Sequence, residues 1–219
     1  MERVTDPNLI RELERYRQEN AELMEKFNEL TEELERQRIT SYEDLQKVDQ
    51  RAAESLVKLA SRTEPYRLGE RSFGFFGLTS TGKSTLINRL IGFDTAETGA
   101  GETTMEIQPY DGQGYRLFDI PGRNDDQSYF TMEYIALRKG LTGRLVLITA
   151  TVKEMTKVFR LLDALNLRYD IVVNKFDSVP FEERQALKKK IGQEIRQCNL
   201  QGDDHVWYLS ALNPEQFPH

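Results

Sequence analysis

The chain has 219 residues, which is long enough for one full domain and an appendage. Its 36 acidic residues outnumber its 30 lysines and arginines, so the composition does not indicate the basic face that a nucleic-acid partner usually needs. Cys198 is the only cysteine, which excludes an intramolecular disulfide and favours a reducing compartment.

The N-terminal residues and the apolar runs indicate the cellular compartment in which the protein is expected. Residues 1–20 contain no apolar stretch of the signal-peptide type. The most apolar run, Leu145–Ile148, is far shorter than the roughly 20 residues that cross a bilayer. We therefore expect a cytoplasmic protein, and peripheral membrane contact stays open.

Residues 1–65 are predicted to be helical, because they contain no glycine and are rich in Glu, Arg, Leu and Gln. A first helix is expected to start at Pro7, with Thr5 or Asp6 as its N-cap. Residues at alternating spacings of four and three then form a heptad seam of about four repeats. They are Leu9, Leu13, Tyr16, Asn20, Leu23, Phe27, Leu30 and Leu34.

The heptad seam allows two interpretations. It can pair two copies of the chain as a coiled coil, in which the polar Asn20 would fix the register. It can instead pack the helix on its own domain. Tyr16 and Phe27 are bulky for a two-stranded seam, and they favour this second interpretation or a looser assembly.

A second helix is expected to start at Thr40, which forms a capping box with Glu43. Its apolar residues lie on one face, and it is predicted to end before Pro65. These apolar residues are Leu45, Val48, Ala52, Leu56 and Leu59. Residues 1–65 thus read as a helical hairpin or two consecutive helices, and residues 66–219 as a separate domain.

From Gly69 onward, predicted strands alternate with predicted helices. The strands are expected at 73–76, 115–118, 145–149, 171–173 and 206–209, and the helices at 84–91, 128–139, 153–166 and 180–197. This alternation predicts an α/β fold with a mostly parallel sheet that helices cover on both faces. Ligands on such sheets bind at the carboxyl ends of the strands, where four motifs occur.

The first motif is Gly77–Ser84, which matches the pattern G-x-x-x-x-G-K-[ST] between a strand and a helix. The backbone N–H groups of such a loop converge on phosphate, and the helix N-terminus adds partial positive charge. Lys83 is expected to bridge phosphate oxygens, and the Ser84 hydroxyl to ligate Mg²⁺. The residues expected to bind the nucleotide here are Thr79, Ser80, Thr81, Gly82, Lys83, Ser84 and Thr85.

The second motif, Asp119–Gly122, comes directly after a strand and 36 residues after Lys83. Asp119 is expected to hold Mg²⁺ through its water shell. The N–H of Gly122 is expected to contact the γ-phosphate and so to sense its loss.

The third and fourth motifs, Asn174–Asp177 and Ser210–Leu212, suggest a guanine site. The Asp177 carboxylate can accept hydrogen bonds from the N1 and N2 donors of guanine, a paired edge that adenine lacks. The stem of Lys175 is expected to cover one face of the base, and Asn174 to tie this loop to the phosphate loop. The N–H of Ala211 is expected to reach the guanine O6. Nucleotide-site residues here are Asn174, Lys175, Asp177, Ser210, Ala211 and Leu212.

Together the four motifs resemble those of P-loop GTPases, over roughly residues 70–212 and in the order that this family uses. The resemblance implies a G domain, GTP and Mg²⁺ as ligands and, usually, hydrolysis of GTP to GDP. It places the first switch at 101–106, where the hydroxyl of Thr103 or Thr104 completes the Mg²⁺ shell. We favour Thr104, because residues 104–110 look like the corresponding stretch of immunity-related GTPases.

Three features depart from the common pattern. Arg123 stands where many members carry a water-orienting Gln, as is frequent among Era-like and septin-like members and immunity-related GTPases. Ser80 stands where potassium-activated members tend to have Asn. Only residues 213–219 follow the fourth motif, so we expect the usual closing helix of the G domain to be missing from this sequence. Either the chain is shortened or the N-terminal helices occupy that packing site.

These observations predict a guanine-nucleotide switch with slow hydrolysis that a second G domain accelerates. The proposed catalytic residues are Lys83, Thr104, Gly122 and Arg123, and the proposed metal ligands are Ser84, Thr104 and Asp119. Arg123 would act across the contact; the alternative interpretation, which has slightly more weight, is a solvated arginine of the switch loop. The expected partner is a second copy of the chain, which would bind through the G domain, the N-terminal helices or both.

The alternative function is a GTP-dependent assembly scaffold with little or no hydrolysis. A third hypothesis, an ATP-dependent kinase, conflicts with the guanine-type motif Asn174–Asp177.

Overall fold

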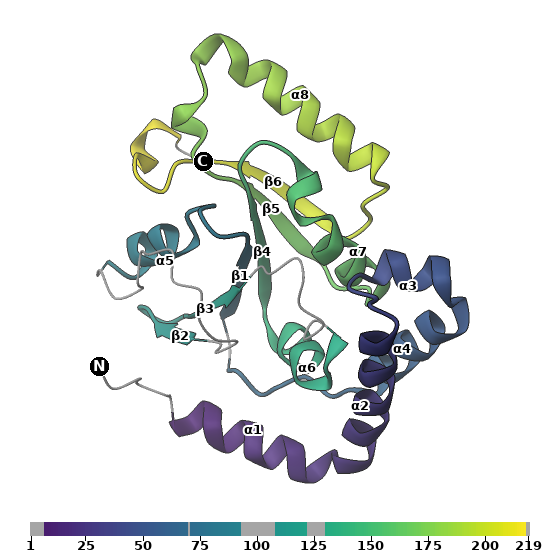
Figure 1. The fold of residues 1–219 in the computed structure, drawn as a ribbon. Coiled ribbons are helices and arrows are strands. Elements are labelled where there is room, and N and C mark those ends of the chain that lie inside the picture. Colours follow the sequence, from purple (N-terminus) through teal and green to yellow (C-terminus); the bar gives the residue numbers. More distant parts are fainter. Residues whose placement is uncertain (1–6, 70, 93–107, 122–129, 218–219) are drawn as a thin grey trace.

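The computed structural model describes residues 7–69, 71–92, 108–121 and 130–217, in which an α/β unit follows a set of N-terminal helices (Figure 1). The helices are α1 (Pro7–Glu19), α2 (Ala21–Arg36), α3 (Tyr42–Val48), α4 (Gln50–Arg62), α5 (Lys83–Ile91), α6 (Met132–Gly140), α7 (Thr156–Ala164) and α8 (Phe181–Gln197). The strands are β1 (Ser72–Gly77), β2 (Gln108–Asp111), β3 (Arg116–Pro121), β4 (Gly143–Ile148), β5 (Tyr169–Val173) and β6 (Asp203–Tyr208). Short 3₁₀ helices include η2 (Val152–Met155), η3 (Phe176–Ser178) and η4 (Pro214–Gln216).

The strands form one six-stranded sheet in the order β2-β3-β1-β4-β5-β6. All neighbours are parallel except β2, which runs antiparallel to β3 at the edge of the sheet. The predicted α/β fold with a mostly parallel sheet is therefore confirmed. The strand β2 was not predicted, because its sequence, Gln-Pro-Tyr-Asp, has no apolar run.

Alternating side chains of the central strands divide the core between the two faces of the sheet. Phe75 and Leu147 belong to the cluster on the face that α5 covers. Phe76 and Val146, one position away in each strand, belong to the larger cluster with α6, α7 and α8. Because period-two alternation sends neighbours to opposite faces, the unbroken apolar runs in these strands reflect burial on both sides.

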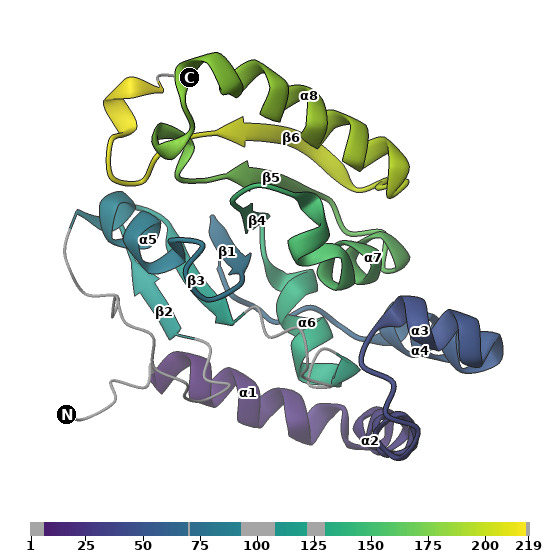
Figure 2. The same ribbon diagram turned by 45° about the horizontal axis from the view of Figure 1, so that its top comes forward.

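The N-terminal heptad seam does not form one continuous helix. It is divided at Asn20, whose backbone leaves helical geometry at φ −122° and ψ 24° and whose side-chain amide donates to the Tyr16 carbonyl at 2.9 Å. Figure 2 shows α1 lengthwise and α2 nearly end-on, so the two helices point in different directions. The expected single four-heptad helix is therefore wrong.

The apolar side of these two helices faces the chain's own core. Tyr16, Phe27 and Leu34 are each only 1% exposed and belong to the same cluster as the α6–α8 layer. The Tyr16 hydroxyl also donates to the Glu64 carbonyl at 2.7 Å. Of the two interpretations of the seam, the structure shows packing on the seam's own chain.

The predicted second helix is likewise two helices, and its start is shifted by one residue. Ser41, not Thr40, is the N-cap of α3, and its hydroxyl oxygen accepts from the Asp44 N–H at 3.0 Å. The chain then turns at Asp49, whose carboxylate accepts from the Ala52 N–H at 3.0 Å and caps α4. Ser41 and Asp49 thus each start a helix, so the apolar face that was predicted for one helix is divided between α3 and α4.

The N-terminal helices dock on α6 and α7, on the opposite side of the sheet from α5. The ammonium of Lys139, in the last turn of α6, donates to the carbonyls of Ala60 at 3.0 Å and of Thr63 at the end of α4. The N–H of Tyr66 donates to the Ala136 carbonyl at 3.0 Å. A Cβ on Gly140 would collide with the Tyr66 carbonyl oxygen, so this close approach requires glycine.

Lys139→Met is expected to lower the free energy of unfolding by about 1–2 kcal/mol, because the end of α4 loses charged hydrogen bonds and a favourable charge at its C-terminus. Burial lowers the pKa of Lys139, and the carbonyls of Ala60 and Thr63 accept the hydrogen bonds of its ammonium. Urea unfolding followed by circular dichroism measures the change. Lys58→Met, on the exposed side of α4, is the matched control and should leave stability unchanged. Equal stability of the two variants would contradict the docking role.

None of the helices in the described ranges is both long enough and apolar enough to cross a membrane.

Candidate nucleotide-binding site

The loop between β1 and α5 has the backbone shape of a phosphate cradle. Ser80 and Gly82 both adopt left-handed backbone angles, with φ of 69° and 88°. A Cβ on Gly82 would lie 2.5 Å from the amide nitrogen of Asn174, so only glycine fits there. Helix α5 begins at Lys83, immediately after the turn, and the N–H groups of its first turn have no acceptor within the helix. Such a helix start is a natural site for an anion.

Three charged or polar side chains meet at this helix start. The Lys83 ammonium donates to the Gly77 carbonyl at 2.8 Å and lies 3.8 Å from an Asp119 carboxylate oxygen. The Ser84 hydroxyl donates to the other oxygen of Asp119 at 3.3 Å. Asp119 reaches this point because β3 lies next to β1, with Asp119 opposite Phe75. The first two predicted motifs are thus in contact.

Burial acts on both charges of this group. It lowers the pKa of Lys83, which the nearby Asp119 opposes. It raises the pKa of Asp119, against the opposing effects of Lys83 and of the hydrogen bond from Ser84. Each charge is therefore destabilised by its surroundings and only partly compensated by its neighbour.

The other loop residues differ in exposure. Thr79 and Ser80 are exposed, and Thr85 is half-buried. Thr81 is 3% exposed, and its hydroxyl donates to the Leu78 carbonyl at 2.8 Å. Thr81 therefore holds the loop together through its hydroxyl and through its N–H, which also donates to the Leu78 carbonyl at 3.2 Å.

Asn174, which directly follows β5, connects the phosphate loop to the loop that follows β6. Its amide nitrogen donates to the Thr81 carbonyl at 2.8 Å, and its amide oxygen accepts from the Ala211 N–H at 3.0 Å. The side chain is almost fully buried, at 2% exposure. One residue at the end of β5 thus fixes the first, third and fourth motifs relative to one another.

Asp177 lies in the 3₁₀ helix η3, which starts after Lys175 turns the chain with a left-handed φ of 59°. Burial alone would raise the pKa of Asp177. Hydrogen bonds from Ser210 and Asn213 outweigh this effect and hold the pKa below its ordinary value. The carboxylate is therefore ionised at neutral pH and available as an acceptor.

The fourth motif differs from its prediction in one respect. The N–H of Ala211, expected to reach guanine O6, donates to Asn174 instead, so its single proton serves the protein. Ser210 is buried, whereas Leu212 is 67% exposed and its carbonyl accepts from Arg89 at 3.3 Å. Asn213, which was not predicted, donates from its side-chain amide to Asp177 at 2.8 Å.

Four predicted site residues lie outside the described part of the chain. They are Thr103, Thr104, Gly122 and Arg123. The described geometry therefore covers the phosphate loop, Asp119 and the base-recognition loops.

Residues 72–175 match a protein-family model described as "50S ribosome-binding GTPase". Residues 72–175 are therefore similar to a P-loop GTPase domain. The matched range runs from the first strand to Lys175, so it includes the phosphate loop, Asp119 and the start of the third motif. No curated protein matches the sequence.

The solved structures that match this chain share little sequence with it. A bacterial selenocysteine-specific elongation factor EF-Sec is 18% identical over 66% of this chain and 26% of its own, with a TM-score of 0.46. A probable GTP-binding protein engB is 18% identical over 66% of this chain and 93% of its own, with a TM-score of 0.45. A GTP-binding protein from the archaeon Sulfolobus solfataricus, in complex with GDP, is 16% identical over 89% of this chain and 62% of its own, with a TM-score of 0.42. The chain thus spans about a quarter of the elongation factor, and the assignment of the GTPase domain rests on the family match and the site.

Proposed function

We propose that the chain is a guanine-nucleotide switch that binds Mg²⁺ and GTP and hydrolyses GTP to GDP. The observation that carries this proposal is the pair of Lys83 and Asp119, whose charged groups lie 3.8 Å apart at the start of α5. Burial disfavours the charged form of each. A phosphate beside Lys83 and a divalent cation beside Asp119 would stabilise both charges at once.

The side chains at this site suit each part of such a ligand. The Ser84 hydroxyl and the Asp119 carboxylate supply the oxygen ligands that Mg²⁺ prefers, and Thr104 is proposed as a further ligand. When bound there, Mg²⁺ would neutralise part of the phosphate charge. Lys83 adds a second positive charge, and the N–H of Gly122 is proposed to sense the γ-phosphate. These residues position the phosphates and hold charge; no covalent chemistry is required of them.

Selection of guanine over adenine is assigned to Asp177. Its carboxylate is ionised, and a guanine base presents two adjacent donors to such an acceptor, whereas adenine presents none in that arrangement. The stem of Lys175, which is exposed next to it, is proposed to cover one face of the base.

Displacement of a fluorescent GDP by unlabelled nucleotides tests the binding proposal. GTP and GDP should displace the label at concentrations at least about 100-fold lower than ATP does, since adenine leaves the Asp177 carboxylate without its paired donors. Removal of Mg²⁺ with a chelator should weaken GTP binding. Displacement by ATP at the same concentration as GTP would refute guanine selection.

For hydrolysis, we propose slow turnover that is accelerated when two GTPase domains meet, with Arg123 acting across the contact. Arg123→Ala should then lower the concentration-dependent part of kcat by about 10³-fold, the lower range for an arginine that stabilises the transferring phosphate. Phosphate release measured over a hundredfold range of protein concentration separates this part from basal turnover. Turnover per molecule that does not change with concentration contradicts the dimer mechanism, and unchanged turnover in the variant contradicts the role of Arg123.

The relationship to Era-like, septin-like and immunity-related GTPases is part of the same proposal. It is supported by Arg123 in place of Gln and by the sequence of residues 104–110. The alternative, a GTP-dependent scaffold that assembles through the heptad seam, has less support because Tyr16, Phe27 and Leu34 are buried in their own chain. A second copy is therefore proposed to bind through the GTPase domain.

A further inference from the structure

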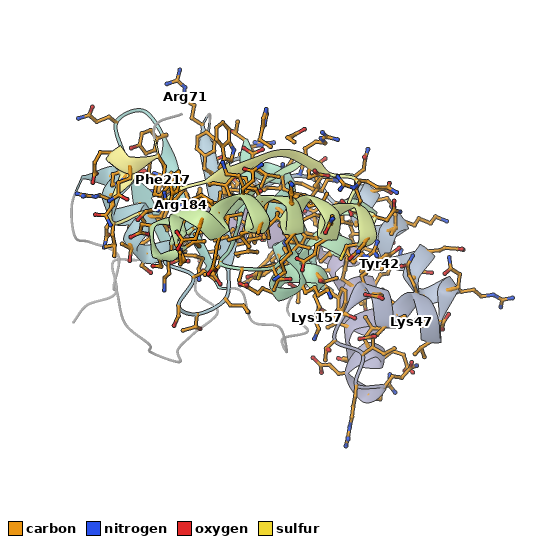
Figure 3. All side chains as sticks on the ribbon, turned by 90° about the horizontal axis from the view of Figure 1, so that it is seen from above. Tyr42, Lys47, Arg71, Lys157, Arg184 and Phe217 are labelled. Carbon is orange, nitrogen blue, oxygen red and sulfur yellow. The ribbon has the colours of Figure 1, made fainter. Side chains whose placement is uncertain are left out.

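The segment after β6 folds back onto the loop that carries Asp177. The ring of Phe217 meets the ring of Phe176 edge-on, with centroids 5.5 Å apart. The guanidinium of Arg184 lies 5.0 Å from the Phe217 centroid and 5.6 Å from that of Phe176. Figure 3 shows Arg184 and Phe217 next to each other at the end of α8. These contacts hold residues 213–217 against η3.

Within this segment, Asn213 makes two hydrogen bonds toward the base-recognition loops. Its side-chain amide donates to Asp177 Oδ2 at 2.8 Å. Its own N–H donates to the Ser210 hydroxyl oxygen at 3.0 Å. Ser210 and Asn213 are also the two side chains whose hydrogen bonds lower the pKa of Asp177. Asn213 therefore connects the segment 213–217 to the carboxylate that is assigned to base selection.

The terminal torsion of an aspartate is soft, so an isolated carboxylate turns through a broad range of orientations. A fixed donor on one oxygen removes that freedom. Each carboxylate oxygen has two lone pairs, so Asn213 uses one acceptor position of Oδ2 and leaves capacity for further donors. A binding group that is already oriented loses less freedom when its ligand arrives.

We propose that Asn213 is a positioning residue for base selection, which orients the Asp177 carboxylate toward the two adjacent donors of a guanine base. This inference rests on the proposed binding of guanine nucleotides. It adds a residue outside the four motifs to the specificity of the site, and it gives the segment 213–217 a role in recognition.

The test compares the dissociation constants of GDP, IDP and ADP for the full chain and three variants. IDP lacks the 2-amino group of guanine, so it presents one of the two donors. Asn213→Ala should weaken GDP binding about 10-fold, as expected for one lost charged hydrogen bond, and IDP binding clearly less. Asn213→Asp should weaken GDP binding further, because a second carboxylate cannot donate and repels Asp177. Gln216→Ala, at an exposed position of the same segment, is the matched control.

Thermal unfolding of each variant shows whether the fold is retained, and Asn213→Ala should melt within a few degrees of the unaltered chain. GDP affinity that is unchanged or tighter in Asn213→Ala overturns the proposal, as does an equal loss for GDP and IDP. A chain that binds GDP no better than ADP before any substitution refutes the proposed function itself. The base preference of the unaltered protein therefore tests the proposed function, and the Asn213 variants test the role of Asn213.

Discussion

Asp177→Asn is expected to change the preferred base from guanine to xanthine. The carboxylate accepts from the N1 and N2 donors of guanine, whereas an amide places a donor where guanine also has one. Xanthine has a carbonyl in place of the 2-amino group and accepts from that amide. We expect about a 100-fold loss of GDP affinity and a gain of similar size for XDP, from one lost charged hydrogen bond and one unpaired donor.

Competition between labelled GDP and XDP at equilibrium measures the change in base preference. Asp111→Asn, at an exposed position of β2, is the control and should keep the preference for GDP. Strand β2 lies at the opposite edge of the sheet from β6, so this carboxylate is remote from the loops that follow β5 and β6. If Asp177→Asn still prefers GDP over XDP, the assignment of the base to this carboxylate is wrong.

Lys83→Met is expected to lower the affinity for GTP by about 100-fold, because the triphosphate loses a buried ammonium that donates charged hydrogen bonds. Methionine keeps most of the apolar stem, so the phosphate loop should retain its shape. Isothermal titration measures the loss. Lys189→Met, on the exposed face of α8, is the matched control and should bind GTP as the unaltered chain does.

The same substitution should change the pH dependence of Mg²⁺-supported binding. Burial raises the pKa of Asp119, and Lys83 opposes that rise. Without the ammonium, the pKa of Asp119 rises further, so the ionised form that ligates Mg²⁺ is lost at a higher pH during acidification. Titrations between pH 5 and 8 should show GTP binding weakening at a higher pH in Lys83→Met than in the control. Identical pH profiles would show that the two groups do not interact.

The parallel sheet was predictable because its central strands β1, β4 and β5 are mostly buried and therefore have apolar runs, such as Ile171–Val173. Strand β2 was not, since it is a polar edge strand with Pro109 and is defined by its partner β3. The break at Asn20 was also hidden from the sequence. The apolar spacing continues through it, because α1 and α2 both direct their apolar sides to the same core.

The candidate site also has parts that could be predicted from the sequence and parts that could not. The contact between Lys83 and Asp119 follows from the order of the strands, which the motifs imply. The role of Asn213 depends on how the chain turns after β6, and a single Asn after a motif has no spacing that marks it. The Ala211 N–H donates to the Asn174 side chain, and a sequence pattern does not specify which acceptor a backbone N–H uses.

Helix α6 lies in close contact with Thr63 and Tyr66, which follow α4. Tyr66 is hydrogen bonded to the backbone of α6, and Gly140 leaves no gap between them. The same short segment continues into β1, which ends at Gly77 and opens into the phosphate loop. The end of α4 and the start of β1 thus both lie against the end of α6, because Lys139 donates to the Ala60 and Thr63 carbonyls and the Ser72 hydroxyl donates to the Gly140 carbonyl at 3.3 Å. We therefore expect a shift of α6 to move the end of α4 and the start of β1, the strand that leads into the phosphate loop, together.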